Sequence, residues 1–231
     1  MTVVAEYRRV LEELGEDRWP AYLNEHSGLP GPRGNLELLA AVADVGDLAM
    51  FDRLIGTDEE YLTACGVVGL GSVLAAGDVS QEARLRRHAS DERWRVREAV
   101  AMALQRLGDA DLPRLLEVVT DWVEDPDPLV QRAAAAGVCE PRLIRTPEAA
   151  AVAIRVCRRA TDLLAARPST SRRDAGVRAL RQGLGYCWSV AVAADPVPGL
   201  AAFDQLRDHR DPDVAWIVRE NLKKKRLTRL L

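Results

Sequence analysis

The sequence predicts an all-α fold, a right-handed solenoid of stacked helical hairpins. Alanine, leucine and arginine are abundant and aromatic residues make up only 5% of the chain, which favours helices because unbranched side chains lose little entropy there. Apolar residues recur with a helical period along most of the chain, without the alternation expected of strands. Helix–turn–helix units recur at a spacing typical of stacked helical repeats.

The first 80 residues contain helices of weak repeat character, separated by one strong break. Val10 and Leu11 mark an amphipathic helix, and a short second helix opens at Asp17 or Pro20. The segment SGLPGPRG at 27–34 cannot be helical, because it holds three glycines and two prolines. Four further helices are expected to start at the capping residues Asn35, Asp47, Thr57 and Ser80.

Residues 81–231 show a clearer pattern of helix, short turn and helix. Asp91 opens the most regular helix, and Gly108 is expected to end it as a glycine C-cap. Thr146 opens a long helix that reaches about Ala166, and the polar segment 167–173 follows it. The remaining helix starts are expected at Asp111, Asp125, Asp174, Asp195 and Asp211.

One pentapeptide occurs twice with a single change: WRVRE at 94–98 returns as WIVRE at 216–220. Each copy follows an aspartate by three residues, so that a valine lies five residues after the aspartate and a basic residue comes next. A third segment, 125–131, shares the aspartate and the valine. Asp91 and Asp125 lie 34 residues apart, and Asp213 lies 88 further on, which leaves room for two more units.

These helix starts resemble HEAT-like repeats. The resemblance implies that the valine enters the core between stacked helices and that aspartate and arginine bond along a ladder of neighbouring repeats. It is good for 91–107 and 211–226, fair for 125–138 and weak before residue 80.

We expect one domain over residues 1–231, with divergent acidic helices in 1–80 and clearer, basic repeats in 81–231. The first part holds 14 acidic and 5 basic residues, a net charge of −9, whereas the second holds 21 acidic and 27 basic residues, a net charge of +6. Along an extended array such a charge gradient can steer an anionic partner.

The sequence contains no motif for catalysis or for cofactor or metal binding. The segment GVVGLGSVLAAG at 66–77 lacks the lysine–serine pair of a phosphate loop, and its glycines are expected to let helices approach closely. The four cysteines form no Cys-x-x-Cys pair, which predicts buried free thiols rather than a zinc site. We therefore expect a non-enzymatic protein without a cofactor or a metal.

The N-terminus and the hydropathy of the chain indicate a cytoplasmic protein. No apolar run reaches the ~18 residues that span a bilayer, and no basic start is followed by an apolar block. A membrane partner is not expected.

Two tryptophans and several basic residues are candidates for a binding surface. Trp94 and Trp216 point nearly opposite to the apolar stripes of their helices, so each either packs on a neighbouring helix or faces a ligand on the concave side. The basic clusters likewise either line one concave surface or form a solvated outer face. The residues expected to bind are Trp94, Arg97, Arg132, Arg178, Trp216, Arg219, Lys223 and Lys224.

The leading hypothesis is a scaffold that presents a concave helical surface to a macromolecular partner, expected to be a protein. The alternative is a DNA-binding protein or a base-excision enzyme, with nucleic acid bound through the basic C-terminal half. The sequence pI of 5.7 favours a solvated outer face for the basic clusters over a surface that tracks a phosphate backbone, because nucleic-acid-binding domains usually exceed ~9. A third hypothesis is a helical domain that regulates a neighbouring enzyme through its acidic end.

The alternative hypothesis of a DNA-binding protein or base-excision enzyme is supported by a family resemblance. Chain length, helix pairs and tryptophan-containing helix starts resemble the bacterial HEAT-like alkylpurine DNA glycosylases, which implies a basic concave cleft that contacts DNA. That family pairs a tryptophan with a carboxylate in one cleft helix, and Trp122 with Asp121 or Asp125 is the nearest local match. The surrounding pattern departs from the family, so no catalytic role is carried over to these residues.

Overall fold

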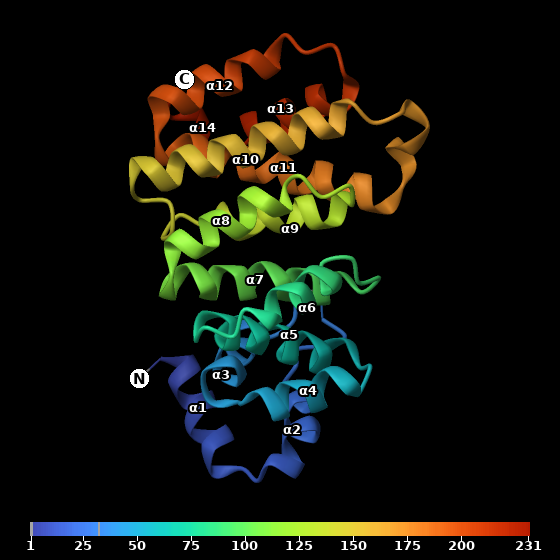
Figure 1. Cartoon of the computed structure of the whole chain (residues 1–231), viewed down its shortest axis with the longest axis vertical. Coiled ribbons are helices and arrows are strands. Elements are labelled where there is room, and N and C mark those ends of the chain that lie inside the picture. Colours follow the sequence, from blue (N-terminus) through green and yellow to red (C-terminus); the bar gives the residue numbers. More distant parts are fainter. Residues whose placement is uncertain (1, 32) are drawn as a thin grey trace. The chain divides into compact units, whose positions relative to one another are not determined.

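The computed structural model describes residues 2–31 and 33–231, and every regular element in these ranges is helical. The chain forms two compact units, residues 1–110 (unit 1) and 111–231 (unit 2), each with its own packed helices (Figure 1). The predicted all-α fold is confirmed. One domain over 1–231, with a change of character near residue 80, stays a prediction. Pro32, within the predicted break at 27–34, lies outside the described residues.

Unit 1 is built around α5, a helix that is buried on almost every side. Its helices are α1 (Val3–Glu13), α2 (Trp19–Glu25), α3 (Leu36–Val45), α4 (Leu48–Gly56), α5 (Glu60–Ala75), α6 (Ser80–His88) and α7 (Trp94–Ala110), with a 3-10 turn η1 (Glu16–Arg18). The central α5 contacts α2, α3, α4, α6 and α7. Its apolar residues therefore run all round the helix instead of forming one stripe.

Three glycines let α5 pack closely against its neighbours. A Cβ atom at Gly66 would lie 2.6 Å from the carbonyl oxygen of Phe51 in α4. A Cβ atom at Gly69 would lie 2.3 Å from the ring of the same Phe51. A Cβ atom at Gly71 would lie 2.5 Å from the Cα atom of Ala103 in α7. Since these distances leave no room for a side chain, the predicted role of the glycines in helix packing is confirmed.

Unit 2 consists of three helix pairs that stack in chain order. The pairs are α8 (Leu112–Trp122) with α9 (Pro128–Val138), α10 (Pro147–Ala165) with α11 (Ala175–Ala194), and α12 (Pro196–Arg207) with α13 (Pro212–Leu222). A 3-10 turn η2 (Ser169–Arg173) precedes α11, and the short α14 (Lys225–Thr228) follows α13. The first helices α8, α10 and α12 contact one another in order, and so do the second helices α9, α11 and α13 (Figure 1). Unit 2 is thus the predicted stack of helical hairpins.

The core of unit 2 combines large apolar side chains with satisfied polar groups. The indole of Trp188 in α11 is fully buried, donates a 3.0 Å hydrogen bond to the Thr161 hydroxyl and meets the Phe203 ring edge-on at 5.9 Å. The buried Asn221 of α13 donates to the Leu184 carbonyl oxygen and accepts from the backbone N–H of Ser189, both in α11. The side-chain amide of Asn221 thus joins α13 to α11, and its hydrogen bonds leave no buried polar atom of the amide unpaired.

All four cysteines are buried and free, which confirms the predicted buried thiols. Burial raises the pKa of Cys65 in unit 1. In unit 2 the sulfur atoms of Cys139 and Cys157 lie 3.5 Å apart. Across residues 2–31 and 33–231, no group of three or more histidine, cysteine or acidic residues is arranged to hold a metal ion.

Every helix in the described part of the chain is too short or too polar to span a bilayer.

The two copies of the pentapeptide are one helical turn out of phase. Trp94 is the first residue of α7, whereas Trp216 is the fifth residue of α13, which begins at Pro212. Four residues make about one turn, so Val96 and Val218 still both point into the core. The two tryptophans, however, occupy different positions along their helices.

Candidate binding surface

A row of polar side chains lies on the outward side of α11. Arg178, Gln182 and Tyr186 are exposed and four residues apart, so they share one side of the helix. Tyr186 keeps 45% of its surface exposed, which is unusual for so large a ring. Leu184 and Trp188 point to the opposite side and are buried.

Side chains from α9 and α13 flank this row and lie over glycines of α11. A Cβ atom at Gly183 would lie 3.2 Å from Cγ of Arg132 in α9, and one at Gly185 would lie 2.8 Å from the ring of Trp216 in α13. Arg219 and Lys223 are exposed on the same side of α13 as Trp216, three and seven residues on. We call this outward side of α9, α11 and α13 the α11 surface; it comprises Arg132, Arg178, Gln182, Tyr186, Trp216, Arg219 and Lys223.

The indole of Trp216 is held in place by an ion-paired arginine. The guanidinium carbon of Arg181 lies 4.9 Å from the centre of the Trp216 ring, within the range of a cation–π contact. The same guanidinium donates a 2.7 Å hydrogen bond to Asp213, whose side chain is only 8% exposed. Asp213 also accepts a 2.6 Å bond from Arg172. The ring therefore rests on a fixed charge network.

Arg172 also fixes the start of α13. It pairs with Asp211, whose carboxylate caps the helix by accepting from the backbone N–H groups of Asp213 and Val214 at 2.8 and 3.2 Å. The hydrogen bond from Arg172 lowers the pKa of Asp211 against the opposing effect of burial. The carboxylate is thus ionised at neutral pH and complements the positive end of the helix dipole.

The C-terminal cations gather round Tyr186. The ammonium nitrogen of Lys224 lies 5.8 Å from the ring centre and the guanidinium carbon of Arg226 lies 5.0 Å from it. Arg226 also donates a 2.9 Å hydrogen bond to the phenol oxygen. Lys223 pairs with Glu220 at 2.6 Å on exposed surface, where such a pair contributes little to stability.

Trp94 and Arg97 belong to unit 1 and are not part of the α11 surface. Trp94 is 45% exposed, with the guanidinium of Arg95 4.9 Å from its ring centre. Arg97 donates to the carbonyl oxygens of Asp91 and Glu92 at 2.5 and 2.7 Å and so closes the start of its own helix. A binding role for Trp94 and Arg97 stays a prediction.

The corner between α6 and α7 makes the stability of the protein depend on pH. Burial lowers the pKa of His88 below its ordinary value of 6.5, Asp91 opposes this, and Arg84 and the neighbouring arginines add to it. A lowered folded pKa means that the unfolded chain binds the proton first as the pH falls. We therefore expect an unfolding free energy that is highest above pH 6.5 and declines below it.

Urea denaturation at a series of pH values measures this dependence. The His88→Gln variant, which cannot titrate, is expected to show a flatter profile between pH 6.5 and 5. Equal slopes for the two proteins in that range would contradict the assignment.

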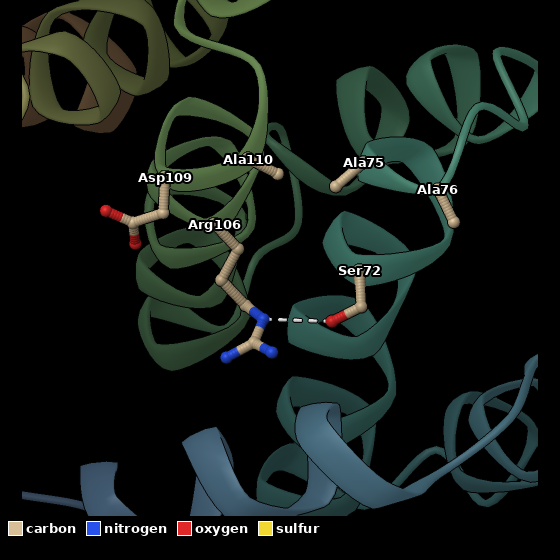
Figure 2. A pocket seen from close by; sticks show the side chains of 6 residues that line it. All are labelled: Ser72, Ala75, Ala76, Arg106, Asp109 and Ala110. Carbon is tan, nitrogen blue, oxygen red and sulfur yellow. Dashed lines mark hydrogen bonds between the residues drawn. The ribbon is translucent and has the colours of Figure 1, made fainter.

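Unit 1 contains an open pocket of about 520 Å³ at the C-terminal ends of α5 and α7 (Figure 2). Its floor is made of alanines, and Arg106 points across it to donate a 2.9 Å hydrogen bond to the Ser72 hydroxyl. Arg106 also pairs with Asp44, while Asp109 points away from Ser72. The polar groups of this pocket either bond to one another or point apart. They therefore do not form a set of side chains arranged to bind a ligand together.

The α11 surface contains only some of the residues that the sequence predicts to bind, and their binding role stays a prediction. Arg132, Arg178, Trp216, Arg219 and Lys223 lie on it as expected residues, and Lys224 lies beside it against Tyr186. The residues missed were Tyr186, Gln182 and the supporting Arg181. The spacing of polar residues at 178, 182 and 186 in an otherwise apolar helix was a signal that could have found the first two.

Trp122, the local match to the glycosylase pattern, is fully buried in the core of unit 2. A ligand in solution cannot reach its ring.

The comparisons with known proteins agree with this architecture. A family model described as HEAT repeats matches residues 52–139. No curated protein matches the chain. Among solved structures, AlkD2 from Streptococcus mutans has a TM-score of 0.68 at 16% identity, and the match covers 90% of this chain and 98% of that one.

Two engineered structures also match, with lower TM-scores. An engineered protein matches at 17% identity with a TM-score of 0.41, over 96% of this chain and 98% of that one. A designed armadillo repeat protein in complex with the peptide (KR)4 matches at 13% identity with a TM-score of 0.37, over 96% and 99%. Together with the repeat match, the likeness to AlkD2 establishes a HEAT-like helical repeat fold.

Proposed function

We propose that this HEAT-like helical repeat protein is a non-catalytic binding module whose α11 surface takes an acidic segment of another protein. The observation that carries the proposal is the presence of the exposed Tyr186 ring, the half-buried Trp216 ring and two unpaired arginines on the outward side of α11 and α13. Arg178 and Arg219 form no ion pair with any described residue; Arg178 precedes Tyr186 by about two turns of α11, and Arg219 follows Trp216 by about one turn of α13. Stacked repeats expose extended surfaces of this kind.

The charge of unit 2 supports an acidic partner. Unit 2 holds 16 acidic and 20 basic residues, a net charge of +4, whereas unit 1 holds 19 acidic and 12 basic residues, a net charge of −7. Asp213, the acid beneath the α11 surface, is already neutralised by Arg172 and Arg181. The cations that remain free can steer a negatively charged chain onto this side of the unit.

The aromatic residues favour protein as the partner. Tyrosine, tryptophan and arginine are the residues that most often dominate the binding energy of protein interfaces. The ring of Trp216 is pre-positioned by Arg181, so little side-chain freedom is lost on binding. The free thiols support a reducing, cytoplasmic location.

Duplex DNA is the second candidate partner, and the positive charge of unit 2 is the observation that favours it. Base excision has less support, because the buried Trp122 cannot contact a base.

A charge reversal in the α11 surface tests the proposal. Arg178→Glu is expected to weaken binding of a labelled glutamate- and leucine-rich peptide by about tenfold or more, since it replaces an attraction with a repulsion at an unpaired cation of the surface. Arg155→Glu is the matched control: Arg155 is also exposed and unpaired in unit 2, but it lies on α10, outside the α11 surface. Its affinity is expected to stay within about twofold of the unmodified protein.

Fluorescence anisotropy at two salt concentrations measures both variants against the peptide and against a labelled duplex DNA. Tighter binding of the duplex, with the steep salt dependence of phosphate contacts, would replace protein by DNA as the partner. Equal losses in the two variants, or no binding of either probe, would contradict a binding role for the α11 surface.

A further inference from the structure

We propose that a second site in unit 2, a pocket between α8 and α10, binds the phosphoryl group of a small phosphate monoester. The pocket has a volume of about 310 Å³ and lies where α8 ends against the middle of α10. A water molecule takes about 30 Å³ of liquid volume, so the pocket has room for a phosphoryl group and the carbon body that carries it. It is formed by the first helices of the pairs, so the inference does not rest on the α11 surface.

Three arginines from one side of α10 line this pocket. Arg155, Arg158 and Arg159 are spaced by three and four residues, which places them on the same side of the helix, and all three are exposed. Like charges at this spacing repel one another, and a bound dianion would relieve the repulsion.

Two of the arginines are held in place by the neighbouring helix pairs. Arg159 donates two hydrogen bonds of 2.7 Å, from Nε and Nη2, to the carboxylate of Glu124. Glu124 follows the end of α8. Arg158 donates to the side-chain carbonyl of Gln205 in α12. Arg155 lies between them in sequence and makes no ion pair or side-chain hydrogen bond with any described residue.

The charge balance leaves the pocket positive. Glu124 and Asp162 both act on Arg159 and compensate its charge, while the partner of Arg158 is a neutral amide. Three arginines and two acids line the pocket, so it keeps one net positive charge, and Arg155 and Arg158 are the two guanidinium groups without an ion pair. The planar N–H fork of a guanidinium matches two oxygen atoms of a phosphoryl group, so a phosphate monoester fits this pair better than a single carboxylate does.

The remaining walls suit a small hydroxylated carbon body. Val123 and Val156 are buried apolar side chains at the base of the pocket. The Thr120 hydroxyl donates its proton to the Leu116 carbonyl oxygen at 2.7 Å, which leaves the hydroxyl oxygen as an acceptor. A polyol or sugar phosphate has the hydroxyl donors that Thr120 and Asp162 can accept from.

Isothermal titration calorimetry with glycerol 3-phosphate tests the site in the full-length protein, with glycerol and inorganic phosphate as comparison ligands. We expect glycerol 3-phosphate to bind more tightly than inorganic phosphate, and glycerol alone to give no signal. Arg155→Gln is expected to weaken glycerol 3-phosphate binding by about tenfold or more, because it removes one charge-assisted contact. Arg145→Gln, the matched control at an exposed arginine that precedes α10 and lies outside both sites, is expected to change the affinity by less than about twofold.

Three results would overturn the proposal: no binding of glycerol 3-phosphate to the unmodified protein, equal weakening by the two substitutions, or inorganic phosphate binding at least as tightly as the ester. Circular dichroism melting curves establish that both variants are folded. The peptide titration depends on Arg178 and this measurement depends on Arg155, so either proposal can fail while the other stands.

Discussion

The Trp188→Ala variant is expected to lose about 3–5 kcal/mol of unfolding free energy. The indole is fully buried between α10, α11 and α12, so the substitution opens a large cavity that the stacked helices can close only in part. It also removes the donor to the buried Thr161 hydroxyl, which keeps only its own bond to the Cys157 carbonyl oxygen. The loss of packing and of the hydrogen bond act in the same direction.

Urea denaturation followed by circular dichroism at 222 nm measures this loss without relying on tryptophan fluorescence. Trp94→Ala removes a side chain of the same size from a 45% exposed position and is expected to cost less than about 1 kcal/mol. If the two substitutions destabilised the protein equally, Trp188 would not be the central core residue that the stacking of unit 2 requires.

Helix starts were predicted best where a single side chain caps the helix. Asn35, Asp47, Asp111 and Thr146 each accept a hydrogen bond from a backbone N–H in the first turn of the expected helix. The capping bond joins residues two or three positions apart, so the signal is contained in the local sequence. Because these capping signals are local, the order of the helices could be predicted from the sequence without knowing how the helices pack.

Several predicted helix boundaries were wrong, and at Gly108 and Thr57 the physical reason is one that local sequence does not reveal. Gly108 was expected to end its helix, but α7 continues to Ala110, and Gly108 is buried inside it. Thr57 was expected to cap α5, but it ends α4 instead, where its hydroxyl donates to the Leu54 carbonyl oxygen. Glycine and threonine serve both ends of a helix, and tertiary packing decides which end.

The α11 surface was only partly predictable, because its members come from three helices. Helical periodicity places Arg178 on the outward side of α11 and Trp216 near the outward side of α13, but it gives no relation between the two helices. The contact between Trp216 and Arg181 depends on how closely α13 approaches α11, which Gly185 permits. A glycine within a helical pattern is the sequence signal for such an approach, although it does not identify the partner.

The Gly71→Ala variant is expected to lose about 2–3 kcal/mol of unfolding free energy, although alanine is the better helix former. The new Cβ atom would lie 2.5 Å from the Cα atom and 2.6 Å from the carbonyl oxygen of Ala103. Both are backbone atoms of α7, so no side-chain rotation relieves the overlap and the two helices must move apart. Because α5 is the centre of unit 1, this movement also loosens the contacts of α5 with α3 and α4.

Gly56→Ala separates this steric effect from helix propensity. Gly56 is the last residue of α4, and a Cβ atom there would have no neighbour within 4 Å. The substitution is therefore expected to be neutral or to stabilise the protein by up to about 1 kcal/mol. Thermal denaturation should lower the melting temperature of Gly71→Ala by about 5–10 °C and leave that of Gly56→Ala unchanged or slightly raised. A Gly71→Ala protein as stable as Gly56→Ala would mean that α5 and α7 do not approach as closely as the glycine requires, and the packing of unit 1 would have to be revised.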